Sequence, residues 1–123
     1  MGIVYYFDTY AFYEIIVNNP NYEKYSGNVT VLTTTLNLME LYYALLRAYG
    51  QAVADHYYNR LRKYCVPFTD SDIKYACKFR YKHKHRKMSY IDCLGYIIAV
   101  RRGAKFLTGD MAFKGFERVE FVI

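Results

Sequence analysis

The sequence predicts an α/β fold: one three-layer domain over residues 1–123, with a mostly parallel, five-stranded sheet flanked by helices. The main observation is that short apolar runs alternate along the chain with longer segments of helical periodicity. The length of 123 residues is also usual for one domain. No internal repeat, linker or low-complexity tract interrupts the alternation.

Five short runs have the composition of buried strands. The first, residues 3–7, is apolar, β-branched and aromatic and stops at Asp8, as expected of a strand buried on both faces. A turn over residues 108–110 follows the fourth run. The other four runs are residues 29–33, 65–68, 104–108 and 119–123.

Three helices are expected in the first half of the chain. One covers about residues 10–17, before a break at Asn18–Asn21. A second covers residues 36–49; the two threonines before it can cap it, and Gly50 ends it. A third covers residues 52–64.

Two further helices are expected in the second half. Thr69–Asp72 offers several acceptors for the first-turn amides of a helix that continues to about His85 with a very basic last turn. Ser89–Asp92 has the spacing of a capping box and opens an apolar helix that runs to Arg102 and is ended by Gly103.

Composition indicates a globular, basic protein. Apolar residues make up 54% of the chain and charged residues 23%, and the 16 Tyr suit half-buried positions and interfaces. The 17 Lys and Arg against 11 Asp and Glu give a net charge of +6. Such an excess permits attraction to nucleic acid but does not demonstrate it.

We expect a cytoplasmic location. Residues 1–8 lack a basic leader and reach a carboxylate too early for a signal peptide, and no apolar run approaches the ~18 residues of a membrane span. Cys65, Cys77 and Cys93 form no C-x-x-C pair, so the simplest interpretation is reduced thiols.

Four carboxylates are placed to meet at one edge of the predicted sheet. Asp8 follows the first strand directly, and Asp110 lies two residues beyond the fourth. Asp92 is in the first turn of its helix, and Glu40 is in the second turn of another. Because strand C-termini and the N-termini of the following helices share one edge of a parallel sheet, these four side chains are expected to converge there.

Each carboxylate also has a structural alternative. Asp8 could cap the next helix, Asp110 could form an Asx-turn, and Asp92 could belong to a capping box with Ser89. Glu40 is harder to explain in this way, because its helix is apolar nearly all round and offers no cation one turn on. A buried, unpaired carboxylate is costly, and a bound metal ion is one of the few things that offsets the cost.

The chemistry that such a cluster suits is metal-assisted. Four clustered carboxylates repel one another unless a cation neutralises them, and all-oxygen ligation selects Mg²⁺ or Mn²⁺ rather than zinc. No Cys and His set with ligand spacing competes. On a basic protein, a cation held in this way suits phosphodiester hydrolysis.

In the order and spacing of these four acids, the chain resembles the PIN domain family, most closely the small stand-alone members typified by VapC toxins. The acids stand 32, 52 and 18 residues apart, in the family's order of Asp, Glu, Asp and Asp. The segments that carry the resemblance are Val4–Thr9, Thr35–Leu41, Ser89–Cys93 and Phe106–Phe113.

The resemblance implies a parallel sheet, hydrolysis of RNA and a Mg²⁺ or Mn²⁺ cofactor. By position, Asp8, Glu40, Asp92 and Asp110 would be the catalytic and metal-binding residues, with Thr9 and Thr108 in support. It also implies that the chain could be the toxin of a type II toxin–antitoxin pair, with an antitoxin as partner. Two alternatives stay open: a PIN nuclease of RNA processing or quality control, and a catalytically silent module that binds RNA or protein.

The densest basic stretch, residues 80–87, immediately precedes Ser89. Lys82, Lys84 and Arg86 are its candidate substrate-binding residues, since they could follow the phosphate backbone toward the metal. The structural alternative is a solvated helix C-terminus.

Two pairs of tyrosines lie on the two middle helices. The default interpretation is core packing; the alternative is a surface for a homodimer or for an antitoxin helix. The residues are Tyr42, Tyr43, Tyr57 and Tyr58.

Overall fold

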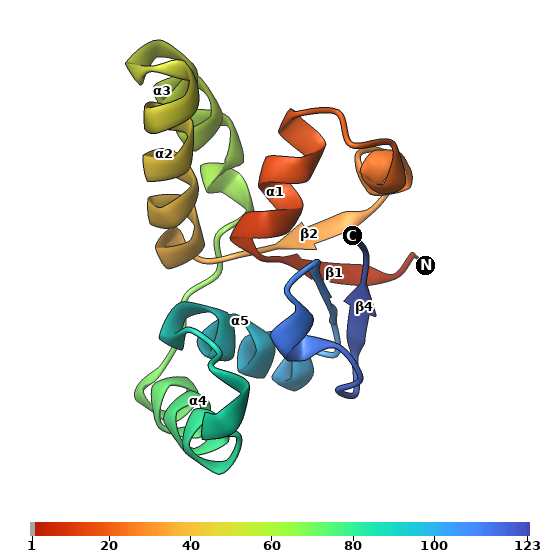
Figure 1. The fold of residues 1–123 in the computed structure, drawn as a ribbon, viewed down its shortest axis with the longest axis vertical. Helices are drawn as coiled ribbons and strands as arrows, with labels where there is room; N and C mark the ends of the chain where they lie inside the picture. Colours follow the sequence, from red (N-terminus) through yellow and green to blue (C-terminus); the bar gives the residue numbers. More distant parts are fainter. Residues whose placement is uncertain (1) are drawn as a thin grey trace.

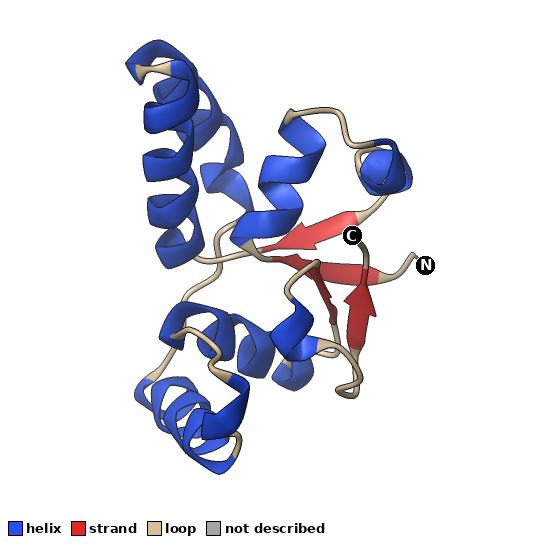
Figure 2. Cartoon of the chain, in the orientation of Figure 1, coloured by secondary structure: helices blue, strands red, loops and turns tan. Residues whose placement is uncertain are grey.

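The computed structural model describes residues 2–123 and has four parallel strands at its centre (Figure 2). Their order in the sheet is β2-β1-β3-β4. Tyr6 of β1 pairs with Leu32 of β2 on one side and with Phe106 of β3 on the other, so the first strand of the chain is central. The strands are β1 Val4–Phe7, β2 Thr30–Leu32, β3 Lys105–Thr108 and β4 Val119–Phe121.

Helices cover both faces of this sheet, which confirms the predicted three-layer α/β fold. The hairpin of α2 and α3 stands with α1 on one face, and α4 and α5 lie on the other (Figure 1). The α-helices are α1 Thr9–Ile16, α2 Thr35–Tyr49, α3 Gln51–Leu61, α4 Asp70–Lys82 and α5 Tyr90–Arg101. The 3₁₀ turns are η1 Pro20–Tyr25, η2 Arg62–Tyr64, η3 Lys84–Arg86 and η4 Met111–Phe113. Within residues 2–123, no helix combines the length and apolar character needed to cross a bilayer.

Alternate residues of β1 build the two cores. Tyr5 and Phe7 belong to the core beneath α1 and α2, whereas Tyr6 belongs to the core beneath α5, where its ring stacks on Phe106. Gly95 allows α5 to approach this closely, because a Cβ there would lie 2.6 Å from the Tyr6 ring. The alternation sets the orientation of β1 and brings Asp8, the next residue, to the C-terminal edge of the sheet.

The prediction of a fifth strand over residues 65–68 is wrong. Cys65 forms only an isolated parallel bridge with Thr33, in which the Val66 amide donates to the Thr33 carbonyl at 2.9 Å. Pro67 has no amide to continue the ladder. Val66 and Phe68 instead pack against the core beneath α5, which explains why this run is apolar.

The fourth helix ends earlier than predicted. We expected it to reach about His85, but α4 ends at Lys82 and the turn η3 follows. Its start is a complete capping box: the Asp72 amide donates to the Thr69 hydroxyl, and the Thr69 amide donates to the Asp72 carboxylate. The basic residues that follow His83 therefore lie on a separate turn.

Candidate active site at the carboxyl edge of the sheet

All four predicted acids line one cleft. Asp8 follows β1, Asp110 lies beyond β3, Glu40 lies on α2 and Asp92 lies in the first turn of α5. The cleft has a volume of about 530 Å³ and is the place where these four elements meet. The remaining lining residues are Thr9, Tyr10, Gly109 and Met111.

Asp8 is both a helix cap and a wall of the cleft. Its side chain is only 2% exposed; Oδ1 accepts the Ala11 amide at 2.8 Å, and Oδ2 accepts the Thr108 hydroxyl. Burial raises the pKa of Asp8 well above its usual value, and the charges of Asp92 and Asp110 raise it further. The hydrogen bonds from Thr108 and Ala11 oppose that rise. The proposed capping role is therefore present and does not remove Asp8 from the site.

Asp92 is also affected by burial and by the charges of neighbouring acids. Burial, followed by the charge of Glu40, raises the pKa of Asp92 to about 7; the hydrogen bond with Ser89 opposes this rise, and the charge of Asp110 adds a smaller contribution to it. The Asp92 amide donates to the Ser89 hydroxyl at 3.0 Å. The reciprocal bond to the Ser89 amide, which would complete a capping box, is not among the contacts of residues 2–123, in contrast to Thr69 and Asp72. The structural alternative for Asp92 is thus only half realised.

Glu40 is less isolated than the sequence suggested. We expected a buried carboxylate without a partner, but the side chain is half-buried, and its Oε1 accepts the Thr9 hydroxyl at 2.8 Å. Thr9 is the residue after Asp8 and the first residue of α1, so one hydroxyl ties the acid of α2 to the start of α1. The partner is a neutral donor, and the negative charge remains.

Asn37 is a supporting residue that sequence reasoning missed. Its side chain is fully buried; Oδ1 accepts the Tyr6 hydroxyl at 2.5 Å, and Nδ2 donates to the Thr9 hydroxyl at 3.3 Å. It therefore orients the hydroxyl that holds Glu40, one helical turn away. The available signal was an amide in the apolar stretch of α2, where an unpaired polar group would be costly.

The loop that carries Asp110 is fixed by its own hydrogen bonds. The Asp110 amide donates to the Thr108 hydroxyl at 3.0 Å, and the Asp110 carboxylate accepts the Ala112 amide at 2.9 Å. Gly109 is required between them, because a Cβ there would lie 2.2 Å from the Tyr10 ring. The turn predicted for Asp110 is thus present inside the cleft.

The cleft has acids but no basic side chain beside them. The two ion pairs among residues 2–123, Asp72–Arg101 and Lys105–Glu120, both lie outside it. Carboxylate and hydroxyl oxygens are the donors that Mg²⁺ and Mn²⁺ prefer, so the chemistry of the donor set fits such an ion. In residues 2–123, however, no three His, Cys, Asp or Glu side chains already stand close enough together to form a ligand cage. The site therefore fits such an ion in the type of its donor atoms and in having all four acids on one cleft.

The comparison with known families decides the classification. The chain matches the model of the PIN domain over residues 5–121, nearly its whole length. The chain belongs to the PIN domain family. The resemblance carried by the four acidic segments is thereby confirmed, and so is the expected fold class.

Solved structures share the PIN fold with this chain at low identity. VapBC2 from Rickettsia felis, bound to a DNA fragment from its promoter, gives a TM-score of 0.72 at 17% identity over 98% of this chain and 100% of that one. A toxin–antitoxin complex from Klebsiella pneumoniae gives 0.71 at 12% identity over 94% of each chain. PAE2754 from Pyrobaculum aerophilum gives 0.70 at 15% identity over 98% of this chain and 92% of that one. No curated protein sequence matches the chain.

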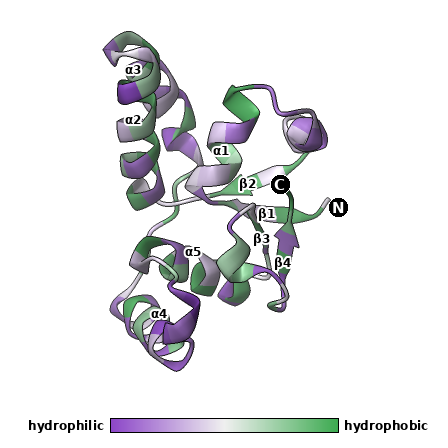
Figure 3. Ribbon diagram, viewed as in Figure 1, coloured by the Kyte–Doolittle hydropathy of each residue, from purple (hydrophilic) through white to green (hydrophobic). Residues whose placement is uncertain are grey.

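The basic segment of this PIN domain lies on α4, which Figure 3 shows in mostly hydrophilic colours, and on η3. Lys82 and Lys84 are exposed. Arg86 instead donates to the carbonyls of Ala112 at 3.0 Å and Lys114 at 2.9 Å. Arg86 thereby fixes η3 against the turn that follows Asp110, so the two lysines are the free members of the predicted set.

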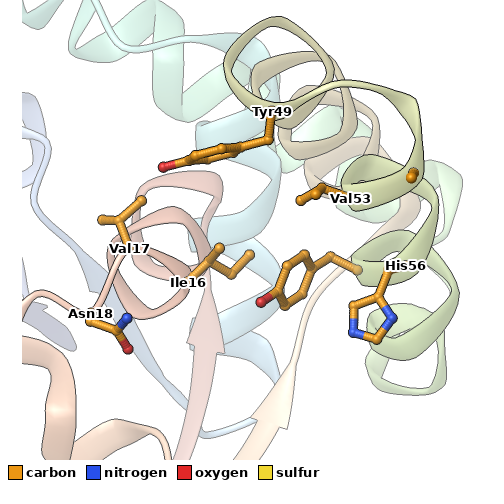
Figure 4. A pocket seen from close by; sticks show the side chains of 8 residues that line it. Ile16, Val17, Asn18, Tyr49, Val53 and His56 are labelled. Atoms are coloured by element: carbon orange, nitrogen blue, oxygen red, sulfur yellow. The ribbon is translucent and has the colours of Figure 1, made fainter.

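The tyrosines of the α2–α3 hairpin of this PIN domain do not form one surface. Tyr42 packs edge-on against Tyr58 and donates to Asp55 at 2.7 Å, whereas Tyr43 is 62% exposed. Tyr57 lines a separate pocket of about 560 Å³ between the end of α1 and α3 (Figure 4). Core packing therefore accounts for part of the group, and the pocket beside Tyr57 is the apolar surface that remains.

Proposed function

We propose that this PIN domain is a metal-dependent endoribonuclease that hydrolyses RNA phosphodiester bonds at the cleft of the four acids. The observation that carries the proposal is the convergence of Asp8, Glu40, Asp92 and Asp110 from four elements, without a basic side chain among them. PIN domains are in general nucleases, which supports the same conclusion. The net charge of +6 is compatible with a polyanionic substrate.

In this proposal the four acids hold Mg²⁺ or Mn²⁺. When bound, such an ion contacts a phosphate oxygen, lowers the pKa of a water molecule and stabilises the leaving oxygen. The chain's own hydroxyls orient the acids beforehand: Thr108 holds Oδ2 of Asp8, and Thr9 holds Oε1 of Glu40. A site whose side chains are held before substrate arrives loses less free energy to ordering when it binds.

We further propose that the protein is the cytoplasmic toxin of a type II pair. VapBC2 and the Klebsiella complex are toxin–antitoxin assemblies of the same fold, and they support an antitoxin as the partner. The pocket beside Tyr57, lined by Ile16, Val17 and Val53 among others, has the apolar character that an amphipathic antitoxin helix would cover (Figure 4). A homodimer is proposed as well, and sedimentation of the isolated protein over a wide concentration range tests it.

The test is cleavage of a panel of labelled RNAs by the purified protein. We expect cleavage with Mg²⁺ or Mn²⁺, none in EDTA, and none by Asp92→Asn with either metal. Asp92→Asn keeps the side-chain volume and removes only the ionisable oxygen, so a correctly folded variant reports on the charge itself. Cleavage that persists in EDTA, or in this variant, would contradict the proposal.

A further inference from the structure

Several exposed tyrosines of α4 and α5 lie directly beneath cations. Tyr90 is 66% exposed, with the Arg80 guanidinium 4.2 Å from its ring centroid. Tyr81 is 74% exposed, with Lys84 at 5.0 Å, and Tyr75 is 52% exposed, with Arg101 at 5.1 Å. Aromatic rings interleaved with Lys and Arg are the surface on which single-stranded nucleic acid stacks its bases.

Tyr90 is the tyrosine of this set that lies nearest in the chain to an acid of the cleft. It is the first residue of α5, and Asp92 follows two residues later in the same turn. Tyr75 provides an internal contrast, because the two cations over its ring are Lys78 of α4 and Arg101, the last residue of α5. At ~1.5 Å per residue, about 13 Å of helix separates Arg101 from Asp92. The same Tyr–Arg arrangement thus occurs at both ends of α5.

Arg80 is held in place without a carboxylate partner. Its Nε donates to the Met88 carbonyl at 2.8 Å, and neither ion pair of residues 2–123 includes it. One face of the Tyr90 ring is therefore covered by a fixed positive charge. Tyr90 is nevertheless 66% exposed, so much of the residue remains accessible.

Tyr90 also lines an apolar depression of about 270 Å³. Leu36 from the first turn of α2, Ala76 from α4, and Ile91 and Leu94 from α5 contribute to its wall. The first two turns of α2 and of α5 also carry Glu40 and Asp92. The N-terminal parts of the same two helices thus contribute residues to both the depression and the acidic cleft.

We propose that Tyr90, with Arg80 on its ring, stacks against an unpaired base of an RNA strand whose phosphate lies at the acidic cleft. The occupant is single-stranded RNA because the surroundings are cationic: the exposed Lys82 and Lys84 follow Arg80 along the chain. Ring, guanidinium and lysines together offer a base-stacking face and phosphate contacts, whereas an apolar peptide would use only the depression. This inference rests on the proposed function and assigns the substrate class of that site.

Tryptophan fluorescence tests the stacking directly, because the chain has no Trp. Tyr90→Trp and the matched Tyr75→Trp are each made in the Asp92→Asn background, so that the probe strand is not cleaved. Each protein is titrated with a single-stranded adenosine octamer and with an abasic ribose-phosphate strand of equal length. The octamer should quench Tyr90→Trp strongly, the abasic strand should not, and Tyr75→Trp should respond to neither.

Affinity supplies the second readout. By fluorescence anisotropy with a labelled octamer, Tyr90→Ala should bind about tenfold more weakly than the parent, whereas Tyr90→Phe, which keeps the ring, should bind within about twofold. Octamer binding without quenching of Tyr90→Trp, or with equal quenching of Tyr75→Trp, overturns the stacking role and leaves the nuclease intact. A fluorescence shift of Tyr90→Trp with protein concentration alone also overturns it, since a second copy would then cover the ring. Absence of both RNA binding and cleavage removes the proposed function as well.

Discussion

Two sets of carboxylates in this protein have opposite surroundings. Asp72 completes the capping box of α4 and lies 2.8 Å from Arg101, and Glu120 on β4 lies 3.6 Å from Lys105 and accepts the Tyr25 hydroxyl. The acids of the cleft accept hydrogen bonds from hydroxyls and amides, but they have no cation. The chain supplies a cation to its structural acids, whereas it supplies none to the acids of the cleft.

This difference has an energetic consequence. A compensated acid stabilises the fold a little, whereas crowded acids of like charge destabilise it. The raised pKa values of Asp8 and Asp92 express that destabilisation, because burial and the neighbouring negative charges disfavour the ionised form of each carboxyl. Removal of a charge should therefore have opposite effects in the two regions.

The largest expected effect is a loss of RNA cleavage on substitution of the cleft acids but not of the structural acids. Glu40→Gln and Asp110→Asn should each reduce RNA cleavage more than about a hundredfold, since loss of even an outer partner of a metal ligand costs 10- to 100-fold. Glu120→Gln is the matched control and should cleave within about twofold of the parent. Initial rates on one labelled RNA, at equal concentrations of folded protein, measure all of these variants. Equal losses in the control and the cleft variants would break the distinction.

The next effect is a pH dependence of stability. Burial and Glu40 raise the pKa of Asp92 from 3.8 to about 7, so between these values the folded protein holds a proton that the unfolded chain has released. The stabilisation from this group is fully present below pH 3.8 and is lost as the pH rises through about 7. In EDTA at pH 8, Asp92→Asn should therefore be more stable than the parent, by about 1–3 kcal/mol.

Urea denaturation at pH 5 and pH 8 measures this prediction. The advantage of Asp92→Asn should shrink at pH 5, because the parent is then largely protonated at this position. Glu120→Gln should change the free energy of unfolding by less than about 1 kcal/mol at both pH values. An Asp92→Asn variant less stable than the parent at pH 8 would show that the cleft is not electrostatically strained.

The smallest effect concerns the basic segment that we expect to contact RNA. Replacement of Lys82 and Lys84 with Gln should weaken RNA binding and reduce the slope of log K against log salt by about 1.4, or ~0.7 per phosphate contact. Arg86 is left in place because it holds η3 to the turn after Asp110. Replacement of Lys24 in η1 and Lys63 in η2 is the control for net charge. An unchanged slope in the first variant would exclude these lysines from the RNA path.

The sequence predicted most of this architecture because parallel α/β topology constrains it. A strand that ends at Asp8 and a turn that carries Asp110 must meet at the same edge as the starts of the next helices. The prediction of a fifth strand failed because a strand and an extended segment that packs on a core can have the same apolar sequence. Pro67 was the local sign against it.

What could not be predicted lies in contacts between residues far apart in the chain. The Thr9 hydroxyl meets Glu40 across 31 positions, and the Tyr6 hydroxyl meets Asn37 across the same separation. Neither pairing follows from periodicity, because each depends on how closely α2 packs against β1. The same holds for Arg86. Its charge led us to predict a phosphate contact, but in the structure its guanidinium donates to two backbone carbonyls.

Calorimetric titration with Mn²⁺ at pH 8 tests the central claim most directly, since it asks whether the uncompensated acids bind a cation without depending on any particular RNA. Saturable binding is expected for the parent and for Glu120→Gln, with at least a tenfold loss of affinity in Asp92→Asn. No binding by the parent, or equal binding by the parent and Asp92→Asn, would contradict the account of the cleft.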